Sequence, residues 1–341
     1  MIYDKIRIII RKSTLHSRRL DTYSLVFIFY CYLNQKFMRA MGKYIRALRA
    51  PFFTASLVSI VLGTAISWEN TGNLDVVLLG LTLLAGLSLH AGTNLVNDYF
   101  DHKSGCDESN LEFVSPFTGG SRVIQNHILS AKSILTFGLV CFVISSLIGL
   151  YLAIKVGWPI FLFGVIGLFS GFFYTAPPIF LVSKGIGEIL VGLNFGILMT
   201  QGAYFVQTQA FSLEALLASV PVALLIMAVL YINEFPDYTA DKQTGKNHLV
   251  VRWGREKAVR GYIFLMLLSY PTVAIGVFIK SLPIWTLLAF LTFPLTFKAI
   301  KTAQIYFNQP HQLVAANANT IKVHLASGLL LSLGYIISKL I

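Results

Sequence analysis

Two stretches rich in aspartate and asparagine are the residues of this chain best suited to chemistry. The first reads NLVNDYFDHKSGCD at 94–107, and the second reads NEFPDYTADKQTGK at 233–246. Of the 15 acidic residues in the chain, eight lie within 98–112 and 234–241. Each stretch follows a long apolar run, where a carboxylate without a positive partner is costly. Two such clusters indicate bound divalent cations and, through them, an anionic substrate such as a diphosphate.

The spacing in each stretch places polar side chains on one face of a helix. In the first stretch, the asparagines and aspartates follow i, i+3, i+4 and i+7, and in the second they recur every four residues. Pro236 removes one backbone hydrogen bond and is expected to loosen the second helix, so that its carboxylates can converge on an ion. Magnesium prefers hard oxygen ligands and keeps waters or phosphate oxygens in its shell. A few carboxylates and an amide oxygen per site meet that need; the alternative is that these acids only cap helices.

Basic side chains interleave with both stretches and are candidate contacts for a departing diphosphate, because nearby cations stabilise its developing charge. They are Lys103 and Arg122 after the first stretch, and Lys242, Lys246 and Arg252 after the second. The alternative is the general enrichment of lysine and arginine at the cytoplasmic ends of membrane helices. A third loop at 174–188 begins with Tyr174, contains a Pro-Pro pair that prevents helix, and holds Lys184.

Nine apolar runs must position these residues. A membrane-spanning helix needs about 20 residues. The runs lie at 51–68, 74–96, 133–154, 157–174, 185–206, 213–235, 259–279, 283–300 and 321–339. Charged residues make up 12% of the chain, about half the fraction of a typical soluble domain. We therefore predict an all-α, polytopic protein of the lipid bilayer.

The distribution of lysine and arginine predicts the orientation of these helices. Of the 27 basic residues, 24 lie in the N-terminal segment or in connections after even-numbered runs, and three lie on the other side. Cytoplasmic connections of membrane proteins are enriched in these residues. The N-terminus and both acidic stretches are therefore predicted to face the cytoplasm.

Composition excludes two other classes of function. The net charge of +12 reflects the cytoplasmic bias, because the chain has no soluble basic domain that could bind nucleic acid. Cys31, Cys106 and Cys141 are odd in number, and their spacing fits neither a disulfide framework nor a metal site. We interpret all three as incidental thiols.

Residues 1–40 form a basic extension that differs from the rest. Its apolar stretch at 23–33 is too short to span a membrane and lacks the cleavage site of a signal peptide. One hypothesis is that the natural chain begins at Met38 or Met41; the alternative is a basic segment that lies on the membrane surface. Residues 41–341 are predicted to form the functional domain.

Five local matches make the chain resemble the UbiA superfamily of membrane prenyltransferases. They are NLVNDYFDHKSGCD (94–107), GGSRVI (119–124), YTAPPIFLVSKGIGE (174–188), GAYFVQT (202–208) and NEFPDYTADKQTGKNHLVVRWG (233–254). The paired acidic motifs point to the superfamily, and the others narrow the resemblance to its 1,4-dihydroxy-2-naphthoate polyprenyltransferase branch. The resemblance implies nine helices around a central cavity, with a polyprenyl diphosphate bound through Mg²⁺ at the acidic motifs and its tail directed into the lipid.

The resemblance also implies roles for individual residues. The metal ligands would be Asn94, Asp98 and Asp101 for one ion, and Asn233, Asp237 and Asp241 for the other, with the four aspartates and Tyr174 as the catalytic residues. Candidate substrate contacts would be Asn97, Lys103, Arg122, Lys184, Lys242, Lys246 and Arg252, of which Arg122 or Lys184 could meet the acceptor carboxylate. The resemblance further implies loss of that carboxylate as CO₂, a place in menaquinone biosynthesis and location in the inner (cytoplasmic) membrane. No obligatory protein partner is implied.

Two alternative functions stay open at this level. Within the same superfamily, the acceptor could be 4-hydroxybenzoate, homogentisate, a chlorophyllide or haem. Outside it, charged residues and proline-interrupted spans also occur at the binding sites of transporters. The acidic residues lie at one membrane face here, whereas transport sites lie near mid-depth, which favours the enzyme.

Overall fold

The computed structural model describes residues 41–115 and 117–341, and all regular structure within those residues is helical. Residues Ala47–Ile341 form one compact unit, and the fold described here is that of this unit. The hypotheses about residues 1–40 lie outside the described residues. The prediction of an all-α, multi-pass membrane protein is confirmed.

Eight helical segments in the described residues are long and apolar enough to cross a membrane. They are η1–α3 (Ala50–Thr71), α4 (Val76–Lys103), α6 (Ala131–Val156), α8–η3–α9 (Gly187–Thr208), α10 (Leu213–Gln243), α12 (Arg255–Phe278), η4–α13 (Ile284–Tyr306) and α14 (Pro310–Leu340). The ninth predicted span, 157–174, contains the shorter α7 (Pro159–Phe172). Its 14 residues extend about 21 Å, less than the roughly 30 Å of a bilayer core, so nine full spans are not confirmed.

Polar residues in the sequence set where the long helices begin and end. Asp75, Ser130 and Ser212 each accept a hydrogen bond from a backbone N–H in the first turn of α4, α6 and α10, respectively. Such caps satisfy donors that the helix leaves unpaired. Gly72 ends α3 with φ 71°, a left-handed conformation that favours glycine.

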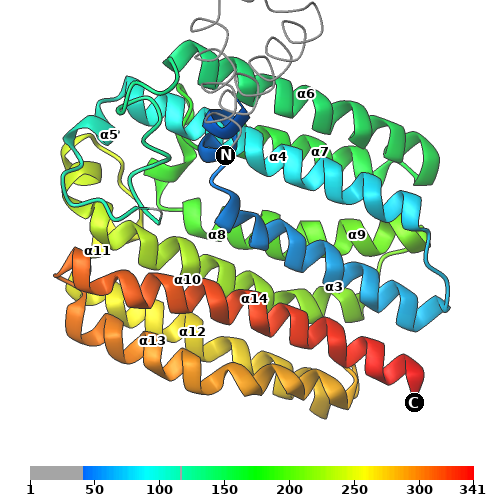
Figure 1. Ribbon diagram of the computed structural model, residues 1–341. Coiled ribbons are helices and arrows are strands. Elements are labelled where there is room, and N and C mark those ends of the chain that lie inside the picture. The colour runs from blue at the N-terminus through cyan, green and yellow to red at the C-terminus, as the bar shows by residue number, and fades with distance from the viewer. Residues whose placement is uncertain (1–40, 116) are drawn as a thin grey trace, which may run out of the picture. The chain divides into compact units, whose positions relative to one another are not determined.

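The helices lie alongside one another, and glycines allow some of them to approach closely (Figure 1). Helix α4 packs against α6 and α7, α3 against α9 and α14, and α10 against α12 and α14. A Cβ atom added to Gly92 of α4 would lie 2.6 Å from the Phe142 ring of α6, and one added to Gly328 of α14 would lie 2.1 Å from Val58 of α3. Small residues at such crossings are the usual means of packing helices in a membrane.

The fourth of these segments contains seven residues of π-helix, η3 (Gly192–Leu198), between α8 (Gly187–Val191) and α9 (Met199–Thr208). A Cβ atom on Gly196 would lie 2.4 Å from Ala223, so η3 packs directly on the backbone of α10. π-Helical turns frequently occur at functional sites. Here the turn carries Asn194 and Phe195, both of which line the cavity described below.

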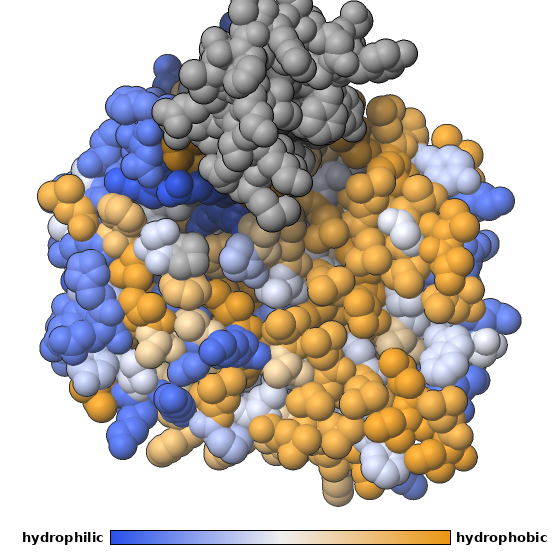
Figure 2. All heavy atoms as spheres, in the orientation of Figure 1, coloured by the Kyte–Doolittle hydropathy of each residue, from blue (hydrophilic) through white to orange (hydrophobic). Residues whose placement is uncertain are grey.

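Both acidic stretches lie at the same end of the bundle. Helix α4 ends at Lys103 and is followed by α5 (Cys106–Ser109), while α10 continues through Pro236 to Gln243 and is followed by α11 (Leu249–Trp253). Figure 1 shows α5 and α11 at one end, and Figure 2 shows hydrophilic residues gathered there beside an apolar surface over the helices. This separation of polar end and apolar side is what a multi-pass membrane protein requires.

Candidate functional site

A cavity of about 500 Å³ lies within the bundle, and its two ends differ in chemistry. Its polar lining includes Asn94, Asn97, Asp101, Asp107, Asn233, Asp237, Asp241 and Lys246. Its apolar lining comes mainly from α4, α6, α7, η3 and α9, and includes Leu89, Leu150, Phe161, Leu168, Phe195 and Met199. The cavity can therefore hold a molecule with a polar head and a long hydrocarbon tail.

The aspartates of the first stretch are buried at the end of α4, with 2% of Asp98 and 6% of Asp101 exposed. Asp98 accepts a hydrogen bond from the backbone N–H of Ser121 at 3.2 Å and lies 3.9 Å from the Arg49 guanidinium. Asp101 accepts one from the Lys246 ammonium at 2.8 Å. Because both carboxylates are out of bulk water, each needs the positive charges and N–H groups that surround it.

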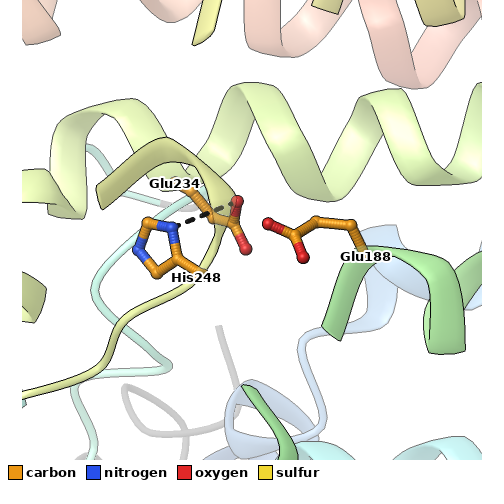
Figure 3. A group of neighbouring side chains, drawn as sticks. All are labelled: Glu188, Glu234 and His248. Atoms are coloured by element: carbon orange, nitrogen blue, oxygen red, sulfur yellow. Dashed lines mark ion pairs between the residues drawn. The ribbon is translucent and has the colours of Figure 1, made fainter. Parts of the chain in front are cut away.

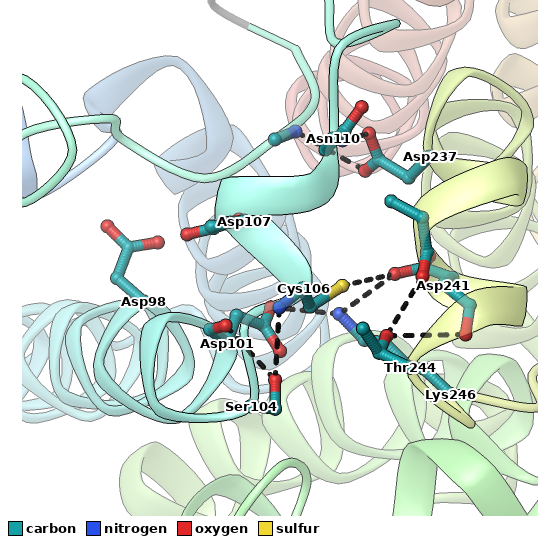
Figure 4. Close-up of polar contacts among 12 residues, drawn as sticks. Asp98, Asp101, Ser104, Cys106, Asp107, Asn110, Asp237, Asp241, Thr244 and Lys246 are labelled. Carbon is teal, nitrogen blue, oxygen red and sulfur yellow. Dashed lines mark hydrogen bonds and ion pairs between the residues drawn. The ribbon is translucent and has the colours of Figure 1, made fainter.

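The aspartates of the second stretch are held by different partners, as Figure 4 shows. Asp237 accepts hydrogen bonds from the Asn110 amide at 2.6 Å and from the backbone N–H of Gly119 at 3.3 Å. Asp241 is contacted by the Cys106 thiol and by His248 Nε2, each at 2.9 Å. The segment after α4 therefore reaches across to α10 and joins the two stretches.

Asp107 is a member of the site that helical spacing did not select. It is 4% exposed and lines the cavity from α5, which folds back after α4 ends. Burial, and then the negative charges of Asp101 and Asp98, raise the pKa of Asp107 to about 9. Its place within the first acidic stretch was a signal, but its six-residue offset from Asp101 does not match the face of α4.

Lys246 places a positive charge between the two stretches. Its ammonium lies 2.8 Å from Asp101 and 3.8 Å from Asp241. Burial alone would lower the pKa of Lys246, but the carboxylates of Asp101 and Asp241 raise it well above its usual value. The side chain is therefore charged, and it occupies a position between carboxylates where a positive charge is favourable.

None of the other predicted cations lines the cavity. Lys103 and Lys242 are exposed in the last turns of α4 and α10, and Lys184 is exposed at the end of the short 3₁₀ turn that precedes α8. Arg252 donates to the backbone oxygens of Asn247 and Ser183, and Arg122 donates to that of Asp107 while it covers the Phe113 ring. Contact between these five cations and the substrate stays a prediction, and their positions outside the cavity do not support it.

Arg49 is a cavity-lining cation that the sequence reasoning missed. Among the described residues, Arg49 and Lys246 are the arginine and lysine side chains in the cavity lining. Arg49 Nε is buried and makes no hydrogen bond within the described structure. The resemblance had suggested Arg122 or Lys184 for the acceptor carboxylate, and neither lines the cavity.

Tyr174 lines the cavity with a hydroxyl group that is buried and has no hydrogen-bond partner in the described residues. Burial, and then the charges of Glu234 and Glu188, raise the pKa of Tyr174 well above its ordinary value. The tyrosine is therefore a neutral donor available to a bound molecule. Asn233, also in the lining, has its amide oxygen bonded to Asn317 at 2.7 Å.

The donor set fits magnesium. Four aspartate carboxylates line the cavity, from Asp101, Asp107, Asp237 and Asp241, against the two cations Arg49 and Lys246. Hard oxygen donors in excess over positive charge are what Mg²⁺ prefers. Within the described residues, one group of three ligating side chains lies within 4.8 Å of one another, and it consists of Glu188, Glu234 and His248. No three aspartates in that part of the chain approach one another that closely. The aspartates in the lining are therefore spread over the polar end, and Asp98, a predicted metal ligand, is not part of that lining.

The loop between the stretches depends on glycine at position 120. Gly120 has φ 71°, and a Cβ atom there would lie 2.9 Å from Asp98 Oδ1 and 3.0 Å from Asp107 Oδ2. We expect Gly120→Ala to lower the prenyl-transfer activity that the sequence predicts at least about tenfold, since a left-handed alanine costs about 1–2 kcal/mol and its methyl group displaces the carboxylates. The measurement is turnover as a function of Mg²⁺ concentration.

Gly105→Ala is the matched control for this substitution, because Gly105 has φ 75° and open space around its Cβ position. It carries the same backbone strain without the carboxylate contact. Equal losses in both variants would show that strain alone, and not the approach to Asp98 and Asp107, limits activity.

Comparison with known proteins adds an independent finding. Residues 56–320 match the sequence model of the UbiA prenyltransferase family. The chain is 29% identical to 1,4-dihydroxy-2-naphthoate octaprenyltransferase of Bacillus subtilis (strain 168), covering 88% of this chain and 94% of that protein. It is 31% identical to the enzyme of that name from Haemophilus influenzae, covering 83% and 92%. The fold matches a UbiA homolog from Archaeoglobus fulgidus bound to DMAPP and Mg²⁺, with a TM-score of 0.59, 16% identity and coverage of 88% and 100%.

Proposed function

Because this chain belongs to the UbiA prenyltransferase family, we propose that it transfers a polyprenyl group from polyprenyl diphosphate to 1,4-dihydroxy-2-naphthoate. A carbon–carbon bond forms to the naphthoate ring, the carbon–oxygen bond to diphosphate breaks, and the acceptor carboxylate leaves as CO₂. The product would be demethylmenaquinol, a precursor of menaquinone. The proposal is carried by one observation: two acidic stretches share the polar end of a cavity whose remainder is apolar.

The polar end would bind the diphosphate. We assign one Mg²⁺ to Asn94, Asp98 and Asp101, and a second to Asn233, Asp237 and Asp241. When bound, Mg²⁺ neutralises negative charge on the diphosphate and makes it a better leaving group. Lys246 adds a fixed positive charge between the two stretches, at 2.8 Å from Asp101. Asp107, at the same end, provides a further oxygen donor.

The apolar part of the cavity would hold the prenyl chain and keep water from the reacting carbon. Loss of diphosphate leaves positive charge on the allylic carbon, and water would quench it. Phe161, Phe195 and Tyr174 line the cavity and can face that charge with their aromatic rings. Lining residues of α6 and α7, among them Leu150 and Leu168, would contact the tail.

Arg49 is our candidate for the acceptor carboxylate. It lines the cavity, and its buried Nε has no hydrogen-bond partner in the described residues. A guanidinium can bind a carboxylate through two parallel hydrogen bonds. Its distance of 3.9 Å from Asp98 brings the acceptor to the same end as the diphosphate.

A panel of acceptors tests the proposed reaction. Purified protein in lipid would be supplied with polyprenyl diphosphate, Mg²⁺ and one acceptor at a time. We expect a prenylated product from 1,4-dihydroxy-2-naphthoate, with one CO₂ released for each diphosphate, and none when EDTA replaces Mg²⁺. Product from 4-hydroxybenzoate, homogentisate, a chlorophyllide or haem instead would keep the family chemistry and overturn the acceptor. Uptake of an acceptor into sealed vesicles with no product would favour the transporter.

We propose that the polar end faces the cytoplasm and that the membrane is the inner cell membrane. Single cysteines at Ser109 and Thr244, in a chain whose three native cysteines are replaced by serine, test this orientation. Both should react with a membrane-impermeant maleimide only after the cytoplasmic face is exposed. The two positions lie at the end of α5 and just after α10. Labelling from opposite faces would contradict a single site shared by the two acidic stretches.

A further inference from the structure

Three buried ligating groups outside the two aspartate sets lie close together: Glu188 of α8, Glu234 of α10 and His248, which precedes α11 (Figure 3). One ligating atom from each lies within 4.8 Å of the other two. Their exposed fractions are 0%, 6% and 0%, respectively. The prenyl-transfer reaction proposed above assigns no role to any of them.

The two glutamates lack the partners that buried carboxylates need. Glu188 Oε1 accepts a hydrogen bond from the backbone N–H of Leu249 at 2.7 Å. Glu188 Oε2 and both oxygens of Glu234 are buried and have no hydrogen-bond partner in the described residues, and the only ion-pair contact of Glu234 there is with His248 Nδ1, at 3.4 Å. Figure 3 shows the two carboxyl groups pointing toward each other. Two facing carboxylates in a protein interior require a cation or a shared proton between them.

The orientation of His248 favours a metal ion. Its Nε2 lies 2.9 Å from Asp241 Oδ2 and donates to that carboxylate. Its Nδ1 accepts a long hydrogen bond from the backbone N–H of Val251 at 3.4 Å, and it also faces Glu234 Oε2. A metal-binding histidine usually donates its second ring N–H to a carboxylate in this manner.

The distance between two of the three ligands agrees with this. His248 Nδ1 and Glu234 Oε2 are 3.4 Å apart. Neighbouring ligands around a tetrahedral zinc ion, with bonds of about 2.0–2.1 Å, are separated by about 3.3–3.4 Å. Two carboxylates also balance the charge of a divalent ion when the imidazole is neutral.

We propose that Glu188, Glu234 and His248 bind a divalent transition-metal ion of the zinc class, at a site separate from the Mg²⁺ sites for diphosphate. One nitrogen and two carboxylates are donors that zinc accepts and that are rarer around magnesium. The ion ties α8, α10 and the start of α11 together. Through His248 it also orients Asp241, which lies in the wall of the cavity.

Metal content tests the proposal directly. The protein, purified through a tag without histidine, would be stripped with a chelator, loaded with ZnCl₂ in a large excess of MgCl₂, and dialysed. We expect about one zinc per chain by mass spectrometry of the metal, and at least a tenfold weaker affinity in Glu188→Gln and His248→Phe. Asp98→Asn is the matched control: it should keep zinc even though prenyl transfer is lost, so the two proposals fail independently.

Cobalt provides a second measurement that does not depend on activity. Co²⁺ loaded in place of zinc should give visible absorption bands in the wild type that are absent in Glu188→Gln, a nearly isosteric change. If His248→Phe does not fold, Glu188→Gln and the cobalt spectrum still decide. The proposal would be overturned if the wild type bound zinc no better than Glu188→Gln, or if His248→Phe retained all of its zinc. Either result would leave a proton shared by the two glutamates as the explanation of their close approach.

Discussion

Asp98→Ala and Asp237→Ala are each expected to lower Mg²⁺-dependent prenyl transfer by at least about 10³-fold, a loss of roughly 4 kcal/mol of transition-state stabilisation. The physical reason is that each aspartate is proposed to hold one of two ions that neutralise the leaving diphosphate. Asp98 is 2% exposed at the end of α4, and Asp237 lies in the cavity wall on α10. The measurement is product formation from radiolabelled polyprenyl diphosphate over a series of Mg²⁺ concentrations.

The comparison of activities is valid only if the variants insert into the membrane and fold as the wild type does. Equal amounts of wild type and variants in the membrane, with the same elution volume in detergent, exclude a loss caused by misfolding. Glu256→Ala is the matched control, since this glutamate is exposed in the first turn of α12 and outside the cavity. Activity within about twofold of wild type in either aspartate variant would show that the metal assignment is wrong.

Lys246→Met is expected to have the second largest effect, with prenyl transfer reduced about 100-fold. The substitution removes the ammonium that lies 2.8 Å from Asp101 and 3.8 Å from Asp241, while its stem length and volume stay similar. Loss of one partner of a buried ion pair costs about 3 kcal/mol or more, because the remaining charge stays buried. The metal-free variant should therefore unfold at a lower temperature than the wild type.

Magnesium distinguishes a role at the diphosphate site from a purely structural one. If the ions bind among the same carboxylates, Mg²⁺ with an unreactive diphosphate analogue should raise the unfolding temperature of Lys246→Met more than that of the wild type. Lys257→Met, an exposed lysine on α12 outside the cavity, is the control. An equal ligand-induced shift in Lys246→Met and wild type would mean that Lys246 and the ions do not share the same carboxylates.

Local patterns in the sequence were sufficient for the class of fold. Apolar runs predicted the helices, and eight of the nine were long enough to span a membrane. The exception, α7, shows the limit of that reasoning: the run at 157–174 is apolar throughout, but its helix begins only at Pro159 and ends at Phe172. Where a run stops being helical depends on the loop that follows it, and the loop after Phe172 packs on other parts of the chain.

The sequence alone determined the chemistry of the two acidic stretches, because residues four apart on a helix share a face whatever the rest of the chain does. Tertiary structure decided which other groups join them. Lys246 meets Asp101 across 145 positions of the chain; Cys106 meets Asp241 across 135; Arg49 and Asp107 enter the same cavity from different elements. Such distances depend on how α4 and α10 pack, and no local pattern encodes them. The same packing places Lys246 in the cavity wall and leaves Lys103, Lys184 and Lys242, which were predicted for the same role, exposed.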